Sequence, residues 1–360
     1  MSYRIGVLLG DDIGLEVVPV AVEVATAAAE HAGATVDWQE LPIGRAAYDT
    51  LGSTLPDGTL QTLQTLDGWV LGPIGHQAYP KTPKAINPHP ILRKHFDLFA
   101  NIRPAKSYPS LKSLHKDVDL VIFRENNEGF QPDRNMVAGS GEFRPTEDIT
   151  LSMRVITRRA CLNIARAAFK AALTRKKQVT AVHKDTVFKL GCGMFAEACK
   201  EVALEFPDVA FNEVMVDTMA LKLVMAPQPF DVLVTTNMFG DILSDLAAGL
   251  VGGLGMAPAL SAGPNHAMAQ ATHGSAPDIA GGGIANPYAM IMSVQMLFEW
   301  LGQRNQDRGL LAAATLIERA VSEIIAEGNA LTPDLGGLSS TQEMGRAVTE
   351  RVSFLEVAAI

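Results

Sequence analysis

Short apolar runs of strand length alternate along this chain with longer runs whose apolar residues recur at helical spacing. The first short run is residues 4–10 (RIGVLLG), and the amphipathic run after it extends from Leu15 to Ala32, where Gly33 closes it. Such alternation is typical of parallel strands joined by crossover helices, so it predicts an α/β fold. By the same criteria we expect further strands at residues 35–41, 66–72, 97–104, 118–125, 178–185 and 230–237, and further helices at about 152–173, 193–206 and 239–249.

The pattern changes after Gly252, where glycine-rich segments replace the regular alternation. Residues 252–265 read GGLGMAPALSAGPN, residues 273–287 read HGSAPDIAGGGIANP, and a strongly helical stretch follows from Tyr288 to Gly328. Because small residues let the backbone approach a ligand closely, we interpret the two glycine-rich segments as the edge of a binding site.

One segment in the middle of the chain fits neither the strand pattern nor the helix pattern of apolar residues. Residues 131–148 (QPDRNMVAGSGEFRPTED) show little apolar periodicity, and the segment is long for a structureless loop inside a compact domain. We interpret it, with its neighbours to about residue 150, as an arm or an excursion that faces a partner.

Composition narrows the class of protein. A chain of 360 residues is long enough for about two domains. The 48% apolar and 19% charged residues indicate a compact soluble protein and not a disordered one. Thirty Lys and Arg against 39 Asp and Glu give a net charge of −9, which disfavours nucleic acid as a partner.

Cysteine usage and hydropathy indicate in which cellular compartment the protein is expected. The three cysteines, Cys161, Cys192 and Cys199, have spacings that fit neither a zinc site nor a disulfide framework, as expected in a reducing cytoplasm. The first residues lack the features of a signal peptide, and the apolar stretch at 246–260 is too short and too rich in glycine and proline for a membrane span. We therefore expect a cytoplasmic protein without a membrane partner.

The common nucleotide and hydrolase motifs are absent from the sequence. There is no G-x-G-x-x-G after a strand, no Walker lysine motif, no H-E-x-x-H and no G-x-S-x-G. A bound nucleotide must therefore be held in another way. The segment from Gly10 to Glu16 (GDDIGLE) joins the first strand to the first helix, and its simplest interpretation is a tight turn with Asp12 as the helix cap.

Asp241 and Asp245 form the first candidate site. They lie at positions i and i+4 of a predicted helix, so they share one helix face just beyond the carboxyl end of a strand. Ligands of open α/β sheets bind at such ends, and carboxylate oxygens suit Mg²⁺ or Mn²⁺. The alternative is a solvated acidic helix start that the helix dipole favours.

Three arginines at or near element ends form the second candidate site. Arg93 lies on a predicted helix (PHPILRKHF, residues 88–96), and Arg103 and Arg124 end two predicted strands. Guanidinium groups bind planar carboxylates with paired hydrogen bonds, so the set favours a small polycarboxylate ligand. Asp97 and Glu125 are near enough in sequence to make ordinary ion pairs with these arginines instead.

Two further positions follow predicted strands. Lys184 comes after QVTAVH, where partial burial would favour a role in proton transfer, although a solvated surface lysine is the commoner case. His273 opens the second glycine-rich segment, whose backbone amides could contact a pyrophosphate while Asp278 accepts from ribose hydroxyls.

Taken together, these segments closely resemble the isocitrate and isopropylmalate dehydrogenase family, whose members oxidise a (2R)-hydroxy acid with NAD(P) and then decarboxylate it. The resemblance covers nearly the whole chain. It is carried by GDDIGLE from Gly10, LRKHFDLFANIRP from Leu92, REN from Arg124, His183 with Lys184, VDTMA from Val216, NMFGDILSD from Asn237, and HGSAPDIAG from His273.

The resemblance implies a fold and an assembly. The expected fold is isopropylmalate dehydrogenase-like, with two domains and parallel or mixed sheets. Residues 1–100 with 255–360 would form a larger, cofactor-binding domain, and residues 101–254 a smaller domain for substrate, metal and dimerisation. A homodimer is also implied, in which Lys184 and Asp217 reach the neighbouring subunit's active site and the arm near 131–150 clasps the partner.

The resemblance also implies roles for individual residues. Arg93, Arg103 and Arg124 would bind the substrate carboxylates, and Asp217, Asp241 and Asp245 would bind Mg²⁺ or Mn²⁺. Lys184 would relay a proton, with Asp217 beside it. The group on C3 of the substrate would meet Asn87 and His89, although His89 is equally a solvated helix-start residue. The cofactor would contact His273, Gly274, Ser275, Ala276, Pro277, Asp278 and Asn286.

Asp278 and three departures from the family pattern bear on function. Asp278 stands where NADP users carry a positive charge, so NAD is the expected cofactor. Gln131 replaces the tyrosine that protonates the enol in this family, and an amide cannot act as that acid. Thr186 and Gln270 replace an asparagine and a glutamate.

We therefore expect NAD-dependent, metal-dependent oxidation and decarboxylation of a 3-substituted (R)-malate of the isocitrate, homoisocitrate or 3-isopropylmalate type. The polar residues before Arg93 favour a polar or carboxylate substituent. Two alternatives stay open: a catalytically weakened or regulatory homologue, and a malate or tartrate dehydrogenase.

Overall fold

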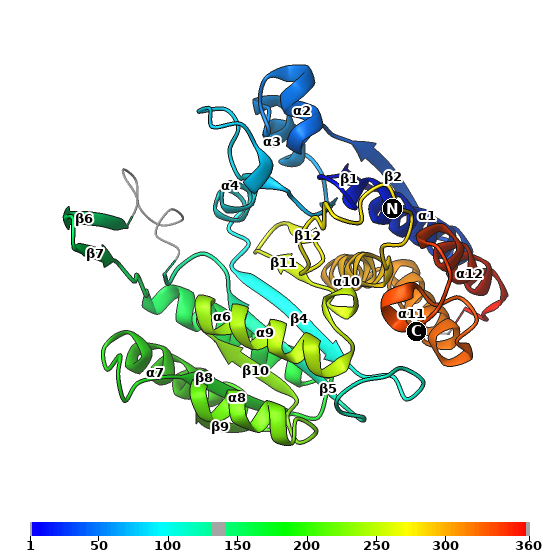
Figure 1. Cartoon of the computed structure of the whole chain (residues 1–360). Helices are drawn as coiled ribbons and strands as arrows, with labels where there is room; N and C mark the ends of the chain where they lie inside the picture. Colours follow the sequence, from blue (N-terminus) through cyan, green and yellow to red (C-terminus); the bar gives the residue numbers. More distant parts are fainter. Residues whose placement is uncertain (1, 131–140, 358–360) are drawn as a thin grey trace.

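The computed structural model describes residues 2–130 and 141–357 of the chain. The main elements alternate between strand and helix, as expected (Figure 1). The strands are β1 (Ser2–Leu8), β2 (Thr35–Glu40), β3 (Gly68–Leu71), β4 (Ala100–Lys106), β5 (Asp119–Glu125), β6 (Glu142–Thr146), β7 (Ile149–Ser152), β8 (Gln178–His183), β9 (Ala210–Met215), β10 (Val232–Thr235), β11 (Leu260–Ala262) and β12 (Ala267–Ala269). The helices are α1 (Gly14–His31), α2 (Gly44–Leu51), α3 (Asp57–Leu63), α4 (Pro88–His95), α6 (Arg158–Ala172), α7 (Gly191–Ala203), α8 (Val216–Met225), α9 (Asn237–Val251), α10 (Tyr288–Asn305), α11 (Arg308–Glu327) and α12 (Thr341–Phe354).

Ten of these strands form one mixed sheet in the order β2-β1-β3-β12-β11-β4-β5-β10-β8-β9. The outer strands pair in parallel, which confirms the α/β prediction. The centre is antiparallel, because β4 pairs antiparallel with both β11 and β5. The expected fold allowed parallel or mixed sheets, and the antiparallel pairs of β4 make this sheet a mixed one. No helix follows β4 before β5, and a parallel pair needs a crossover connection.

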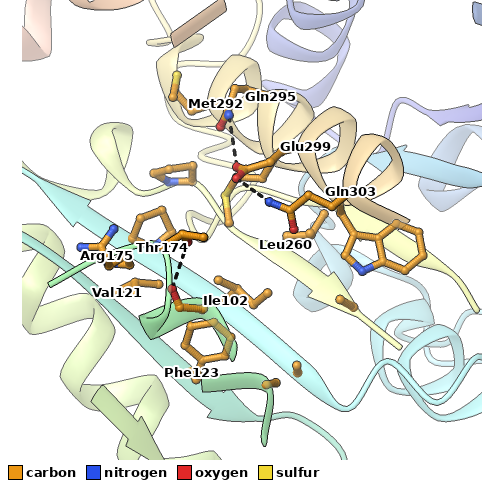
Figure 2. A pocket seen from close by; sticks show the side chains of 18 of the residues that line it. Ile102, Val121, Phe123, Thr174, Arg175, Leu260, Met292, Gln295, Glu299 and Gln303 are labelled. Carbon is orange, nitrogen blue, oxygen red and sulfur yellow. Dashed lines mark hydrogen bonds between the residues drawn. The ribbon is translucent and has the colours of Figure 1, made fainter. Parts of the chain in front are cut away.

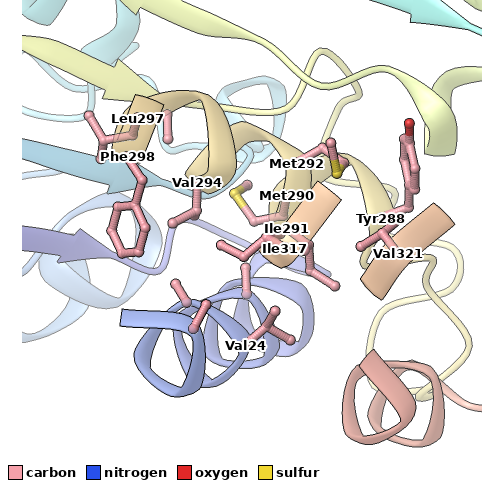
Figure 3. Packing of buried hydrophobic residues seen from close by; sticks show 14 of the residues in the cluster. Val24, Tyr288, Met290, Ile291, Met292, Val294, Leu297, Phe298, Ile317 and Val321 are labelled. Carbon is pink, nitrogen blue, oxygen red and sulfur yellow. The ribbon is translucent and has the colours of Figure 1, made fainter. Parts of the chain in front are cut away.

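Helices gather around the two ends of this sheet in separate groups (Figure 1). Helix α1 packs with α10, α11 and α12 over β1, and Figure 3 shows Val24 of α1 beside Ile291 and Val294 of α10 and Ile317 of α11. At the other end, α6 and α7 pack on one face of β8 and β10, and α8 and α9 on the other. Burial of these apolar faces stabilises both groups.

The helices differ from the expected ones in two boundaries and in three further short helices, α2, α3 and α8, besides α12. The stretch from Tyr288 to Gly328 is two helices, because Gln306 adopts a left-handed conformation (φ 54°) and the Asp307 side chain caps α11. Helix α6 begins at Arg158 and not at about Ser152, because Ser152 ends β7 and the Thr157 side chain caps the helix. Helix α12 was not expected.

The part of the expected arm that the structure describes is an antiparallel ribbon of β6 and β7. Every residue of both strands is exposed, and the ribbon lies outside the main sheet (Figure 1). No helix within the described ranges, 2–130 and 141–357, is long and apolar enough to cross a membrane.

Candidate functional site

Two arginines and two aspartates meet between β4, β5 and α9. Arg103 Nη1 lies 3.2 Å from Asp241 Oδ1 and 3.5 Å from Asp245 Oδ1. Arg124 Nη1 donates to the same oxygen of Asp241. Arg103 lies in the middle of β4 and not at its end, whereas Arg124 is the last residue but one of β5, as expected. We call these four residues the Arg–Asp cluster.

Buried polar residues fix the two guanidinium groups of the cluster. Arg103 Nη1 donates to Ser244 Oγ at 2.6 Å and its Nε to Asn101 Oδ1 at 2.5 Å. Arg124 donates twice to Asn237 Oδ1, from Nε at 3.1 Å and from Nη2 at 2.6 Å. Asn237 and Ser244 are both on α9, so this helix positions the arginines as well as the aspartates. No pattern in the sequence signals these pairings.

Burial divides the Arg–Asp cluster into a protein side and a solvent side. Arg103 and Arg124 are 8% and 2% exposed, whereas the side chains of Asp241 and Asp245 are 47% and 54% exposed. Burial lowers the pKa of Arg103, and the two carboxylates oppose that shift. Burial also raises the pKa of Asp245, against the field of Arg103. The carboxylates thus face open space, where they can meet a ligand or a cation.

A single chain does not gather the three expected metal ligands. Within residues 2–130 and 141–357, no three His, Cys, Asp or Glu side chains lie together in a way that would hold a metal. Asp217, in the first turn of α8, instead accepts from Lys184 Nζ at 2.7 Å. This bond is the main reason that the pKa of Asp217 is lowered. Within one chain, Asp241 and Asp245 could therefore contact a cation without Asp217, so they would cover only one side of it.

Lys184 follows β8, as expected from the sequence. Its side chain is 25% exposed and bonded to Asp217, so it is neither fully buried nor an isolated surface lysine. Strand β10 lies between β8 and β5, and Thr235 of β10 pairs with both Val182 and Arg124. Lys184 therefore lies two strands from Arg124, and both residues are at the carboxyl ends of their strands.

Arg93, His89 and Asn87 all lie at α4, and Gln270 links two of them. Gln270 is buried after β12, its Oε1 accepts from Arg93 Nη2 at 3.4 Å, and its Nε2 contacts His89 Nε2. Asn87 Oδ1 caps α4 by accepting from His89 N at 3.1 Å. The structure thus gives Asn87 a local structural role that the sequence analysis did not assign to it.

The expected cofactor loop packs against the first strand–helix turn. Ser275 O accepts from Ile13 N at 3.1 Å, and Glu16 Oε1 accepts from Gly281 N at 2.6 Å. Gly274, Pro277 and Asp278 are exposed, and Ala276 has a positive φ of 44°. The loop from His273 and the turn before α1 therefore form one continuous wall of the expected cofactor site.

Two residues of this loop differ in their bonding. His273 Nδ1 bonds to Gly274 O, and burial lowers the pKa of the imidazole. Its Nε2 is buried and has no hydrogen-bond partner among the residues that the structure describes. An orphaned buried nitrogen fits a polar ligand group at this wall. Asn286 instead donates to Asp334 Oδ2 at 3.0 Å and accepts from Tyr288 N at 2.9 Å, so its amide is occupied within the fold.

Asp11 is a structural residue that the sequence analysis missed. Its carboxylate accepts from Arg45 N, Gly75 N and Tyr79 Oη at 2.7, 2.8 and 2.5 Å, and burial together with this bond raises the pKa of Tyr79. Asp12 is not the helix cap that we expected: the capping position is Ile13, without a side-chain bond, and Asp12 has a φ of 50°.

Gln131 lies outside the residues that the structure describes. The other expected site residues fall into four groups: the Arg–Asp cluster, the Lys184–Asp217 pair, the α4 group with Gln270, and the loop from His273 to Asn286. Buried arginines meet solvent-facing carboxylates at the carboxyl end of β10. The fold and these residues define the class: an α/β protein with a mixed sheet and a cluster of opposite charges at the ends of its strands.

Comparisons with known proteins identify the family. A model of the isocitrate/isopropylmalate dehydrogenase family matches residues 4–348. The chain is 40% identical over 355 residues to 3-isopropylmalate/3-methylmalate dehydrogenase of Methanocaldococcus jannaschii, covering 97% of this chain and 99% of that protein. It is also 40% identical over 356 residues to isocitrate/homoisocitrate dehydrogenase of Thermus thermophilus, covering 99% and 100%.

The fold agrees with that result. The crystal structure of isocitrate dehydrogenase from Methylococcus capsulatus superposes with a TM-score of 0.84 at 40% identity and covers 98% of this chain and 99% of that one. The chain belongs to the isocitrate/isopropylmalate dehydrogenase family and is a β-decarboxylating dehydrogenase of that family. The resemblance and the fold class inferred from the sequence are confirmed.

Proposed function

We propose that this protein oxidises and decarboxylates a 3-substituted (R)-malate with NAD and Mg²⁺ or Mn²⁺. The Arg–Asp cluster is the observation that carries the proposal. It combines two fixed cations, which suit substrate carboxylates, with two solvent-facing carboxylates one helical turn apart, which suit a hard cation. Arg93 completes the set of arginines from α4.

Each group of residues has a distinct task in this proposal. Arg93, Arg103 and Arg124 orient the substrate through its carboxylates, and Asp241 and Asp245 hold the divalent cation. When bound, the cation polarises the substrate hydroxyl and NAD accepts the hydride. Lys184, after it has given up a proton to solvent, takes the hydroxyl proton at the neutral Nζ, and Asp217 keeps that amine in place through the 2.7 Å bond.

The loop from His273 to Asn286 supports NAD as the cofactor. The side chain of Asp278 is exposed at the wall that this loop forms with Glu16. A carboxylate there accepts from ribose hydroxyls and repels a 2′-phosphate. We expect a higher kcat/KM with NAD than with NADP, and comparable values for the two cofactors would contradict this assignment.

We also propose that the protein is a homodimer with shared active sites. Asp217 is bonded to Lys184 and does not join Asp241 and Asp245 within one chain, so a second subunit would supply the third carboxylate. Helices α8 and α9 carry apolar side chains that a partner would cover, since such exposed groups favour association. Leu221, Val224, Met225 and Ile242 are 62%, 49%, 70% and 58% exposed.

We also propose two domains, with residues 1–100 and 255–360 in one and 101–254 in the other, a division that the buried apolar clusters support. Two apolar clusters draw almost entirely on the first set and two on the second. Three buried residues are exceptions. Tyr108 and Leu111 pack in the cluster around α1 and α10, and Ala100 packs in the cluster around α6.

The position of His89 supports a polar group on C3 of the substrate. His89 and Arg93 are four residues apart on α4, so their side chains share one face of that helix. Gln270 contacts both side chains and so holds the imidazole beside the arginine. A polar side chain in that position favours a polar or carboxylate substituent over an apolar one.

The test is NADH production with isocitrate, homoisocitrate, 3-isopropylmalate, malate and tartrate, each with Mg²⁺ or Mn²⁺. We expect turnover of at least one 3-substituted malate and loss of metal activation in Asp241→Asn. Asp49→Asn, on exposed α2, is the matched control. Unchanged metal activation in Asp241→Asn would overturn the metal assignment, and turnover of only malate or tartrate would favour the alternative substrates.

A further inference from the structure

A cavity of about 840 Å³ lies on the opposite face of the strands that carry the Arg–Asp cluster (Figure 2). Successive side chains of a strand point to opposite faces of a sheet. Arg103 and Arg124 therefore point to the candidate site, whereas Ile102 and Phe123, which pair across β4 and β5, line the cavity. The cavity is separate from the candidate site.

The cavity has an apolar floor between two helical walls. Ile102, Val121, Phe123 and Leu260 form the floor (Figure 2). Helix α10 forms one wall, and the end of α6 with Arg175 forms the other. Its volume is in the usual range for small-molecule sites. The apolar floor is bordered by polar and charged side chains, which could fix the orientation of a ligand.

Two of the three positive charges that line the cavity, Arg175 and Lys106, have salt-bridge partners. Arg175 bonds to Asp119 and Asp231 at 2.8 and 2.7 Å, and Lys106 bonds to Glu318 at 2.9 Å. The third, Lys170 on α6, is exposed and also lowers the pKa of Glu205, which does not line the cavity.

Glu299, on the α10 wall, is the contrasting case. Its carboxylate accepts from Gln303 at 2.9 Å and from Gln295 at 3.5 Å, and no salt bridge to it occurs within residues 2–130 and 141–357. Figure 2 shows all three side chains along the face of α10 that borders the cavity. Burial raises the pKa of Glu299, the field of Glu318 adds to that shift, and Arg175 opposes it. Glu299 is nevertheless exposed and lines the cavity, so a cation can reach this carboxylate directly.

We propose that the cavity is a second ligand site, which takes a primary amine with an aromatic or branched aliphatic body. The ammonium group bonds to Glu299, and the body packs on Ile102, Val121, Phe123 and Leu260. This site goes beyond the proposed function, because its ligand is a cation and the substrate of the Arg–Asp cluster is an anion.

Calorimetry with 2-phenylethylamine tests the site directly, and Trp300, which lines the cavity, supplies a fluorescence signal. 3-Phenylpropionate and 2-phenylethanol are the matched acid and alcohol. We expect saturable binding of the amine, weaker binding of the alcohol and none of the acid. Equal binding of all three, or no binding of the amine, would overturn the proposal. Turnover is not measured, so the result does not depend on the proposed function.

Two variants locate the binding. Glu299→Gln removes the charge but keeps the shape, and we expect it to weaken amine binding about tenfold, the scale of one hydrogen bond to a charged group. Ala171→Trp fills the cavity from the α6 wall and should abolish binding of both amine and alcohol. Glu350→Gln, on an exposed position of α12, is the control and should bind as the wild type. Unchanged affinity in both cavity variants would place the amine elsewhere and overturn the proposal.

Discussion

At the residue scale, the neutral amide of Gln270 contacts Arg93 without neutralising the positive charge that a substrate carboxylate would meet. Its amide oxygen meets Arg93 and its amide nitrogen meets His89, so it contacts both without adding a negative charge. A carboxylate in the same place would form an ion pair with Arg93 and compete with a substrate carboxylate for it. The amide avoids that competition.

We therefore expect Gln270→Glu to raise KM for the malate substrate by about tenfold, the effect of roughly 1.4 kcal/mol, with a smaller change in kcat. Steady-state kinetics measures both constants. Gln342→Glu adds the same charge at an exposed position of α12 and should leave both unchanged. An unchanged KM in Gln270→Glu would show that this amide does not control the charge of Arg93.

The Lys184–Asp217 pair gives a prediction about pH. The bond to Lys184 holds the pKa of Asp217 below its ordinary value of 3.8. Because the folded-state pKa is the lower one, the pair stabilises the fold above about pH 4 and loses that contribution as the pH falls. Lys184→Met should return the pKa of Asp217 towards 3.8, which an NMR titration of the carboxyl carbon measures. Lys222→Met, on exposed α8, is the control, and an equal pKa in the two variants would count against the pair.

The chemistry of the site was more predictable from the sequence than its bonding. Residue type and element position predicted Arg124, Asp241 and Asp245 as site residues, because charged groups at strand ends and on one helix face carry their own signal. Arg103 was predicted in the same way, although it lies in the middle of β4. The bonds of Arg124 to Asn237 and of Arg93 to Gln270 join residues far apart in sequence. No local pattern encodes such pairs.

At the scale of elements, α9 controls the geometry of the site because it packs directly on Arg124. A Cβ atom added at Gly240 would lie 2.7 Å from Cβ and Cγ of Arg124, closer than real contacts allow. Gly249 lies on the same helix and has nothing within 4 Å of such an atom. The two glycines offer a matched pair.

Gly240→Ala should destabilise the fold by about 1–3 kcal/mol, the usual cost of overpacking, and should weaken substrate binding by moving Arg124. Gly249→Ala should instead stabilise the fold by up to about 1 kcal/mol, because alanine is the better helix former. Urea denaturation of both variants measures these effects. Equal stability changes in the two variants would show that the approach of α9 to Arg124 has no energetic consequence.

Element boundaries were predictable where the chain carries a local stop signal. Gly33 follows the end of α1, and the carboxyl end of β10 leads into α9 as expected. The break at Gln306 was missed because no glycine or proline marks it. Helix α12 begins with a capping box of Ser340 and Glu343, a signal in the sequence that the analysis did not use. The antiparallel pairing of β4 depends on contacts distant in sequence, which periodicity does not report.

At the scale of the whole molecule, the described chain holds the components of the site in separate places. Asp241 and Asp245 lie with two arginines, and Asp217 lies with Lys184. The exposed apolar side chains of α8 and α9 lie on the helices that carry Asp217 and Asp241. A partner that covers these helices would bring the Lys184–Asp217 pair of one subunit near the Arg–Asp cluster of the other.

Shared sites make a sharp prediction for mixed dimers. Lys184→Ala and Asp241→Asn should each be inactive alone, because every site in either homodimer lacks one essential group. In a mixed dimer, one site combines the intact Lys184 of the Asp241→Asn subunit with the intact Asp241 of the Lys184→Ala subunit. Random mixing makes half of the dimers mixed, with one intact site in two, so we expect about a quarter of wild-type activity.

The measurement is NADH production after the two inactive variants are unfolded together and refolded, with each variant refolded alone as the control. Recovered activity should rise with the fraction of mixed dimers and reach its maximum at equal amounts of the two chains. If each site were built within one subunit, every site in the mixture would still lack Lys184 or Asp241. A mixture as inactive as its components would therefore contradict the shared site and return both residues to a single chain.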